Sequence, residues 1–498
     1  MADIIISKLD PAQIIRKAYD EPNNRIRVDA ELSNLEVEIS VDAATGDNVA
    51  IANQTGDTFL AINPDGSINT NSKSGNADAF GRNRVSEPVT LGDYKHTYGT
   101  DPGLLDKTIN GATVTHSANK SCATLTTSSN SASSAIHQTK AYHQYQPGKS
   151  QMILSSVCFG YAQQNVTKRT GYFDDRDGIY FEQVGSNTSS GIDNGQLNFV
   201  IRSYTSGTAS EAAIGSYLRR VPQSQWNKDK CDGTGASGFN INTSKTILVY
   251  IDFQWLGVGR VRVGFVHDGE FVVAHEYYHS NVLDTVYMSN PSLPVRCEIL
   301  NTGATSGGSM DQICSTVASE GGYIENGIDW SILSGLRTTS TPSGTVLPVM
   351  AIRLKNTFNG NPNRMLVKLN NISIYAETNS IQYELIKVPD TNGILGTLTW
   401  TSADDSSGVE YCVNATGIYI PSTTNIDKLA SGYAAAGSSQ NSLSTINTGS
   451  LTASKRNFIS QNFDSSNSEI YVLLARTVTS AGNVTANVAV SFQWREIY

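Results

Sequence analysis

Charge is scarce in this sequence. Only 16% of the 498 residues are Asp, Glu, Lys or Arg, against about 25% in an average soluble domain. The formal net charge is −9, from 36 basic and 45 acidic residues. A chain that binds nucleic acid or an anionic membrane surface through its charge needs a basic patch. We therefore expect neither of these partners.

Long hydrophobic runs are also missing. The longest apolar runs, such as Ile247–Ile251, are far shorter than the roughly 20 residues of a membrane-spanning helix. The apolar Ile4–Ile6 meets Lys8 and Asp10 almost at once, so we expect no signal peptide. The sequence predicts no membrane span and no export by that route.

Cysteine and proline are few. The six cysteines contain no C-x-x-C pair, which argues against a zinc ribbon and against a dense disulfide scaffold. We interpret them as small core residues of a protein made in a reducing compartment. With 42 glycines but only 14 prolines, the composition favours many turns and argues against a collagen-like or proline-rich disordered chain.

The sequence contains enough apolar residues, 39%, to build a sizeable core, and its length favours about three domains. We expect an N-terminal anchoring unit at residues 1–76, a linker or signature segment at 77–96, a β-sandwich at 97–376 and a C-terminal β domain at 377–498. In the first unit, Asp10-Pro11 predicts the start of a short helix over residues 10–19. Alternating segments with turn signals then predict hairpins as far as the polar run 69–76.

The remainder of the chain predicts strands separated by glycine-rich connections, which is typical of two packed antiparallel sheets in a jelly-roll or lectin-like sandwich. The fold class is therefore predicted to be all-β. The expected strands of the sandwich are 152–157, 178–183, 197–204, 246–253, 261–267, 271–278 and 295–300, with 366–374 closing it. Those of the C-terminal domain are 395–400, 417–420, 470–475 and 488–494.

The sequence His275-Glu276-Tyr277-Tyr278-His279 matches H-E-x-x-H, which binds zinc only when a helix places both histidines on one face. Here Asp268-Gly269 between two alternating segments predicts a two-residue hairpin instead. Residues four apart on a strand are separated by about 13 Å, too far for one zinc ion. Counting back from this turn, we expect Arg262 to face His275, and we predict no zinc site.

Two further segments resemble nucleotide-binding loops. Gly148-Lys149-Ser150 matches the end of a P-loop, but the expected first glycine is His143 and no helix start follows. The segment Gly233–Gly238 matches G-x-G-x-x-G without a preceding strand. Both loops lack the context that phosphate binding requires, so we interpret both as ordinary turns.

Two groups of carboxylates are candidates for calcium binding and for glycoside hydrolysis. Asp174, Asp175 and Asp177 precede Gly178 without the spacing of a calcium loop, so we interpret them as turn residues. Glycoside hydrolysis needs two carboxyl groups about 5 to 9 Å apart, and the best candidates are Glu182, Glu325 and Asp329. No G-x-S-x-G elbow is present.

Several long segments, in order, resemble a family of uncharacterised bacteriophage virion structural proteins. The resemblance spans about residues 79–300. It is carried by 79–88 (AFGRNRVSEP), 145–150 (YQPGKS), 229–238, 253–262 (FQWLGVGRVR), 275–281, 286–288 and 293–299. The apparent zinc and nucleotide motifs fall inside these segments, and the resemblance implies no catalytic, cofactor-binding or metal-binding residues.

The resemblance implies a virion component, assembled in the host cytoplasm, of the fibre, collar or capsid-decoration type. We expect the N-terminal unit to dock to other head, neck or tail proteins. An alternative is a tail-associated protein that binds host glycans, since the chain contains 22 Tyr and 5 Trp that could stack on sugar rings. An enzyme that cleaves surface polysaccharide is the less favoured third hypothesis.

Self-association is the last expectation. Open sheet edges must be paired or covered, and symmetric assembly is a common solution. The resemblance to fibre proteins favours a homotrimer. We expect the apolar faces of strands 470–475 and 488–494 to lie near its three-fold interface.

Overall fold

The computed structural model describes residues 19–20, 25–26, 88–185, 194–303, 306–339, 346–388, 398–413, 427–437, 443–447, 458–478 and 484–498. The chain divides into two compact units, Met1–Asn71 and Ser72–Tyr498. In the first unit, β1 (Tyr19–Asp20) pairs antiparallel with β2 (Arg25–Ile26). The helix predicted over residues 10–19 lies outside the described residues, except for Tyr19, which belongs to β1.

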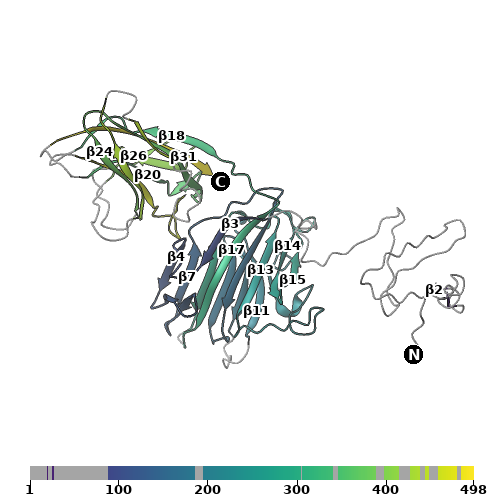
Figure 1. Ribbon diagram of the computed structural model, residues 1–498. Coiled ribbons are helices and arrows are strands. Elements are labelled where there is room, and N and C mark those ends of the chain that lie inside the picture. Colours follow the sequence, from purple (N-terminus) through teal and green to yellow (C-terminus); the bar gives the residue numbers. More distant parts are fainter. Residues whose placement is uncertain are drawn as a thin grey trace, which may run out of the picture. The chain divides into compact units, whose positions relative to one another are not determined.

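The second unit begins with a sandwich of two antiparallel sheets (Figure 1). The first sheet has seven strands, in the order β12 (Arg220–Pro222), β11 (Gln196–Arg202), β10 (Gly178–Val184), β9 (Val166–Phe173), β16 (Val295–Asn301), β7 (Ser133–Thr139) and β4 (Leu104–Ile109). The second has eight, in the order β15 (Glu270–Tyr277), β14 (Val261–His267), β13 (Ile247–Phe253), β8 (Ser150–Cys158), β17 (Ser309–Glu320), β6 (Cys122–Thr126) and β5 (Thr113–Ser117), with β3 (Val89–Lys95) paired to β17.

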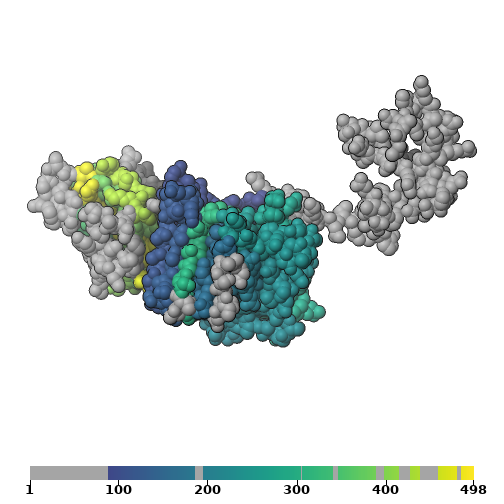
Figure 2. Space-filling view, turned by 90° about the horizontal axis from the view of Figure 1, so that it is seen from below, coloured from purple at the N-terminus to yellow at the C-terminus, as the bar shows by residue number. Residues whose placement is uncertain are grey.

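Strands that are distant in sequence are neighbours in this sandwich. β17 pairs with β8, β6 and β3, from which it is separated by about 150 residues or more. Figure 2 shows part of this arrangement on one face, where a green band lies against the blue of the early strands. The fold therefore depends on long-range pairing, because the sheet can close only after residue 309 has been placed.

A second sandwich follows, again with two antiparallel sheets. One contains β18 (Ile328–Leu333), β31 (Asn487–Ile497), β23 (Leu366–Ala376) and β28 (Leu443–Asn447), with β19 (Arg337–Thr338) and β29 (Phe458–Ile459) at its borders. The other contains β25 (Thr401–Ser402), β26 (Val409–Cys412), β20 (Leu347–Leu354), β30 (Ile470–Thr477), β24 (Ile381–Val388) and β27 (Asp427–Ala434). A small pair, β21 (Thr357–Phe358) with β22 (Asn361–Pro362), and the 3₁₀ turn η5 (Gln223–Gln225) complete the described elements.

Alternation of side chains explains both cores. In β8, Ile153 and Val157 are buried while Met152 and Leu154 are half-buried, as expected when successive residues point to opposite faces of a sheet. The first core is built from such residues of both sheets, among them Phe181 and Phe265. The second is built around Trp494.

The all-β prediction is confirmed, since the described residues form antiparallel sheets in a lectin-like sandwich arrangement and contain no α-helix. The seven strands expected between residues 152 and 300 are present within two residues of their predicted ends. In the described part of the chain no helix is long and apolar enough to cross a membrane. All six cysteines are free thiols.

Two predictions about the later strands are wrong. Strand 366–374 does not close the first sandwich, because β23 pairs with β31, β28 and β29 of the second. The expected boundary at residue 376 therefore separates strands that are bonded to each other. Alternating hydrophobicity predicts a strand but not its partner, which explains the error.

The expected subunit interface is also wrong in its location. β30 and β31 are interior strands of their sheets. Their large apolar side chains, including Tyr471, Leu473, Phe492 and Trp494, are buried inside the chain itself. These strands have no free apolar face to offer a neighbouring subunit.

Candidate functional site

The outer face of the seven-stranded sheet carries a connected group of charged side chains. Tyr172, Phe181 and Phe199 point into the core, so the alternate residues of the same strands point to the other side. We call this surface the arginine–glutamate face. It comprises Arg169, Glu182, Arg202, Arg220, Arg296 and Glu298, with Tyr180, Phe173 and Asn198 among them.

The register of β9, β10 and β16 places three charged residues of this face side by side. Arg169 of β9 lies directly between Glu182 of β10 and Glu298 of β16. Its Nε donates to Glu182 Oε2 at 2.8 Å and its Nη1 to Glu298 Oε1 at 2.9 Å. Glu182 is fully buried and also accepts from Asn198 Nδ2 at 3.2 Å and from Arg220 Nη1. A buried carboxylate needs such partners to remain charged.

The same face also carries Arg296 and a small apolar cluster. Arg296 Nε donates to Gln138 Oε1 at 2.6 Å and its Nη1 to Asp175 Oδ1 at 2.5 Å. Phe173 and Tyr180 pack together with Val200. The guanidinium carbons of Arg296 and Arg202 lie 5.4 and 5.6 Å from the Phe173 ring. These cation–π contacts hold the two arginines over the sheet.

A long connection contributes one more carboxylate. β11 and β12 are adjacent antiparallel strands, yet residues 203–219 separate them, whereas hairpin loops usually have about 2 to 5 residues. Glu211, in the middle of this loop, reaches the sheet. Its Oε1 accepts from Arg202 Nε at 2.9 Å and Nη2 at 2.8 Å, and from the Tyr180 hydroxyl, while its Oε2 accepts from Arg220 Nη2.

The charge state of Glu211 follows from these contacts. Burial alone raises the pKa of its carboxyl group, but the hydrogen bond from Tyr180 and the charges of Arg202 and Arg169 outweigh burial, so the pKa lies below its ordinary value. Glu211 therefore stays ionised until the pH falls below the ordinary glutamate range near 4.5. The loop is fastened to the sheet by an ion pair over the whole neutral range.

The structure does not bring together the carboxylates considered for glycoside hydrolysis. Glu182 lies in the first sandwich, bonded to arginines. Glu325 pairs with Lys368 Nζ at 2.5 Å, and Asp329 pairs with Arg495 Nη2 at 2.8 Å, both in the second sandwich. Glu182 and Glu298 both accept hydrogen bonds from the guanidinium of Arg169.

The H-E-x-x-H segment lies in the hairpin that the sequence predicts. β14 and β15 join at Asp268 and Gly269, with positive φ at both (49° and 80°), as a type I′ turn requires, and His267 pairs with Glu270. The expected pairing of Arg262 with His275 is wrong. A β-bulge shifts the register between Val263 and Gly264, so Arg262 faces Glu276 and Val263 faces His275.

His279 is placed differently from the prediction, because β15 ends at Tyr277. Its Nδ1 bonds to the carbonyl of Gly259 at 2.5 Å and its Nε2 to the Tyr217 hydroxyl at 2.8 Å. The ring stacks on Tyr287 at 4.0 Å. Among the described residues no group of three or more His, Cys, Asp or Glu has the geometry of a metal site.

We therefore expect His279→Ala to destabilise the chain, by about 3 kcal/mol, because it removes two buried hydrogen bonds and a stacked ring. A chelator should leave the melting temperature of the unaltered chain unchanged. Thermal melts of both samples, with His267→Ala as an exposed control, check this. A melting temperature that falls with chelator would contradict the prediction that the chain has no zinc site.

The two nucleotide-like loops have structural roles. Ser150 begins β8 and its hydroxyl donates to Asp252 Oδ1 at 2.7 Å, so no helix follows Gly148. In the 233–238 loop, Asp229 accepts from the backbone N–H groups of Cys231 and Ser237, both at 2.8 Å. The Asp229 carboxylate occupies the position where a phosphate would have to sit, as a Cβ added to Gly235 would lie 2.1 Å from its Oδ1.

The acidic turn before Gly178 is confirmed as a turn. Asp174 Oδ1 accepts from the N–H groups of Arg176 at 2.8 Å and Asp177 at 2.9 Å. Asp177 in turn accepts from the backbone N–H groups of Tyr204 and Ser289. These oxygens hold loops together, and Asp175 is engaged by Arg296.

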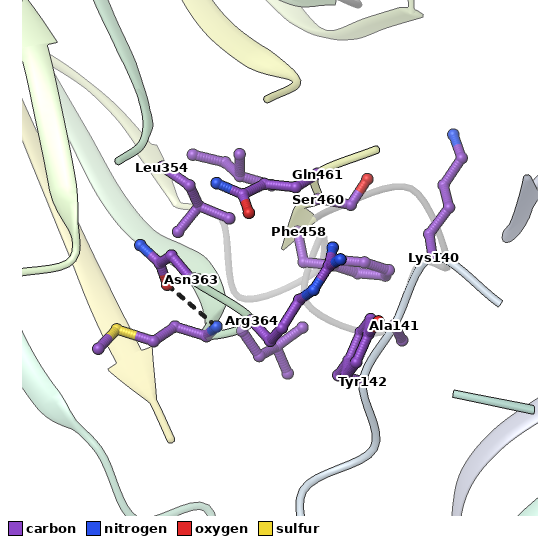
Figure 3. Close-up of a pocket in the computed structure, with 12 residues that line it drawn as sticks. Lys140, Ala141, Tyr142, Leu354, Asn363, Arg364, Phe458, Ser460 and Gln461 are labelled. Atoms are coloured by element: carbon purple, nitrogen blue, oxygen red, sulfur yellow. Dashed lines mark hydrogen bonds between the residues drawn. The ribbon is translucent and has the colours of Figure 1, made fainter. Parts of the chain in front are cut away.

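A small pocket lies near Lys140, Ala141 and Tyr142, with Leu354, Asn363–Leu366 and Phe458–Gln461 completing its lining (Figure 3). Asn363 Oδ1 accepts from the N–H of Met365 at 3.2 Å there. The pocket has room for no more than about one water molecule. It is not a site for a sugar or a cofactor.

No family model and no curated protein matches the chain. Solved structures with a similar fold include three of interest. The carbohydrate recognition domain of Emp47p is 10% identical to this chain, with a TM-score of 0.28. The aligned region spans 47% of this chain and 97% of the Emp47p domain. A Bacteroides ovatus GH16 protein in complex with a mixed-linkage glucan product is 10% identical, covers 46% and 99%, and has a TM-score of 0.30.

The third is a carbohydrate esterase from the Shiga toxin-encoding bacteriophage phi24B, 11% identical, covering 47% of this chain and 99% of its own, with a TM-score of 0.27. Likenesses at this level do not indicate what the chain binds or catalyses. The chemistry of the arginine–glutamate face has to be interpreted from its own residues.

Sequence reasoning identified Glu182 but missed the arginines around it and Glu211. Arg169, Arg202 and Arg220 stand at separate places in the chain and meet only through the strand register. One feature of the sequence does point to the loop that contains Glu211. The segment that follows the predicted strand 197–204 is polar and far too long for a hairpin turn, and long loops in compact domains are often functional.

Proposed function

We propose that the chain is a structural component of a bacteriophage virion, of the fibre, collar or decoration type. The family-like segments support this, because those within the described residues belong to the first sandwich, including parts of β13, β14 and β16. The observation that carries the proposal is the division of the chain into a small N-terminal unit and a larger body of two sandwiches. Such a division suits an anchor joined to a projecting part.

The chemistry of the described residues is consistent with this role. The six free thiols suit a protein assembled in the reducing cytoplasm of a host. We propose no catalytic activity, since Glu182, Glu211 and Glu298 all accept from arginines. Self-association remains part of the proposal, with an interface away from β30 and β31.

Removal of residues 1–76 tests the anchoring role. The remaining chain keeps both cores, so it should stay soluble and folded, while its incorporation into particles should fall at least about tenfold because the docking unit is gone. Particles purified on a density gradient and analysed by quantitative mass spectrometry give the copy number. Normal incorporation of the shortened chain would place the attachment site in one of the sandwiches.

We propose glycan binding at the arginine–glutamate face as a second function. The observation that favours it is the group of arginine, tyrosine and asparagine donors on one sheet face, next to the long loop 203–219. Sugar hydroxyls are bound in proteins by a few such placed polar groups. Binding of the purified full chain to immobilised host-surface polysaccharide tests it, with Arg202→Ala expected to weaken the binding.

A further inference from the structure

The Glu211 carboxylate is held in the way a protein holds a carboxylate ligand. Two guanidinium groups and one phenol surround it, and both of its oxygens are bonded. Arginine and tyrosine donors arranged around a planar anion are a recognition geometry for carboxylates. Here the anion comes from the chain's own loop.

The loop around Glu211 is otherwise attached mainly at its two ends, where the Tyr204 N–H donates to Asp177 Oδ1 at 3.0 Å and the Arg219 carbonyl accepts from the Ile201 N–H at 2.8 Å. Ser203 and Ser210 form a backbone bridge at its start, and Tyr217, which bonds to His279, packs near its end. Between them, Ser206–Ala209 and Ala212–Ser216 are exposed. Because none of these exposed residues contributes to the core, moving this stretch would cost mainly the ion pair of Glu211.

We propose that Arg202, Arg220 and Tyr180 form the subsite for the carboxylate of an acidic sugar, a uronic or sialic acid residue, and that Glu211 occupies this subsite in the free chain. The proposal rests on the proposed glycan-binding function. On binding, the ligand carboxylate takes the place of Glu211, and the exposed stretch around Glu211, between the Ser203–Ser210 bridge and Tyr217, moves away from the sheet.

Charge balance selects a singly charged ligand. Without Glu211, the face contains Arg169, Arg202, Arg220 and Arg296 against Glu182, Glu298 and Asp175, which leaves one positive charge. A carboxylate with a single negative charge neutralises it. A phosphate dianion would leave an excess negative charge beside the buried Glu182, which is unfavourable.

Replacement of Glu211 in the full chain tests the proposal. Glu211→Ala removes the internal competitor, and Glu211→Gln removes its charge at nearly constant size, in case the alanine variant folds poorly. The matched control is Asp329→Ala, which also removes a carboxylate from a two-bond pair with an arginine, Arg495, but in the second sandwich. Calorimetric titrations with sodium glucuronate, N-acetylneuraminate, glucose and inorganic phosphate measure binding.

Both Glu211 variants should bind the two acidic sugars about tenfold more tightly than the unaltered chain, because an internal competitor acts at a high effective concentration. Asp329→Ala should bind like the unaltered chain, and adding Arg202→Ala to Glu211→Ala should abolish the gain. No gain in either Glu211 variant, or tighter binding of phosphate than of glucuronate, would overturn the proposal. If the unaltered chain binds neutral polysaccharide while the Glu211 variants show no gain, glycan binding stands and this subsite falls.

Discussion

At pH 5 the first sandwich should unfold at a much lower urea concentration than at pH 7.5. Five of its histidines are buried, and in four of them, His96, His143, His275 and His279, burial lowers the pKa from 6.5 to about 4. Between these values the unfolded chain binds protons that the folded chain does not bind. Stability therefore rises with pH across this window and is lost as the pH falls through it.

The expected loss of unfolding free energy at pH 5 is large. At pH 5 each such histidine lowers the free energy of unfolding by about 2 kcal/mol, so the four together approach about 8 kcal/mol, comparable to the whole stability of a typical domain of about 5–15 kcal/mol. Carboxyl groups with ordinary pKa values near 4 contribute little above pH 5. Most of the loss should therefore come from histidine.

Hydrogen exchange in urea, analysed by mass spectrometry, reports each sandwich separately. The peptides of β9 and β10 should lose protection at pH 5, and those of β30 and β31 should change less. His143→Gln should reduce the pH-dependent loss by about a quarter, whereas His267→Gln, at an exposed position, should not alter it. If the unaltered chain, His143→Gln and His267→Gln all lose the same stability between pH 7.5 and pH 5, the buried histidines are not the cause of the loss.

Loss of Arg169 should be the most damaging single change on the outer face of the seven-stranded sheet. Its side chain is 15% exposed and it separates two glutamates, one of them fully buried. Arg169→Met leaves Glu182 to Arg220 and Glu298 to Arg296, which is 3.5 Å away, and incompletely compensated buried charges cost up to about 3–5 kcal/mol. The midpoint of urea unfolding should fall accordingly.

A combined variant distinguishes charge from packing. Adding Glu182→Gln and Glu298→Gln to Arg169→Met removes the stranded charges, so most of the stability should return. Lys120→Met is the matched surface control, since Lys120 is 67% exposed in its pair with Asp311 and exposed pairs contribute little. If the triple variant is no more stable than Arg169→Met, the ion pairs are not the reason for the loss.

Local patterns in the sequence predicted local structure well. The Asp268-Gly269 turn and its flanking strands follow from turn chemistry and alternation, which involve only neighbouring residues. The bulge at Val263/Gly264 changed the partner of Arg262 by one residue. It depends on how the two strands pack on the sheet and has no distinct signal in the sequence.

The candidate site could be predicted only in part. Glu182 was recognised as a carboxylate on a strand. Its partner Arg169 belongs to β9, next to β10, and its partner Arg220 belongs to β12, on the far side of β11. Cross-strand neighbours depend on sheet order and register, which one sequence does not specify. The same reason explains why β23 was assigned to the wrong sandwich.

Imaging of intact particles that carry a labelled form of the full chain tests the proposed virion role most directly. A C-terminal tag detected by a bound antibody fragment in electron cryomicroscopy marks the chain without altering the arginine–glutamate face. The account predicts label at fixed, symmetry-related positions on the outside of every particle. Particles without label, from infected cells in which the tagged chain is present and folded, would contradict it.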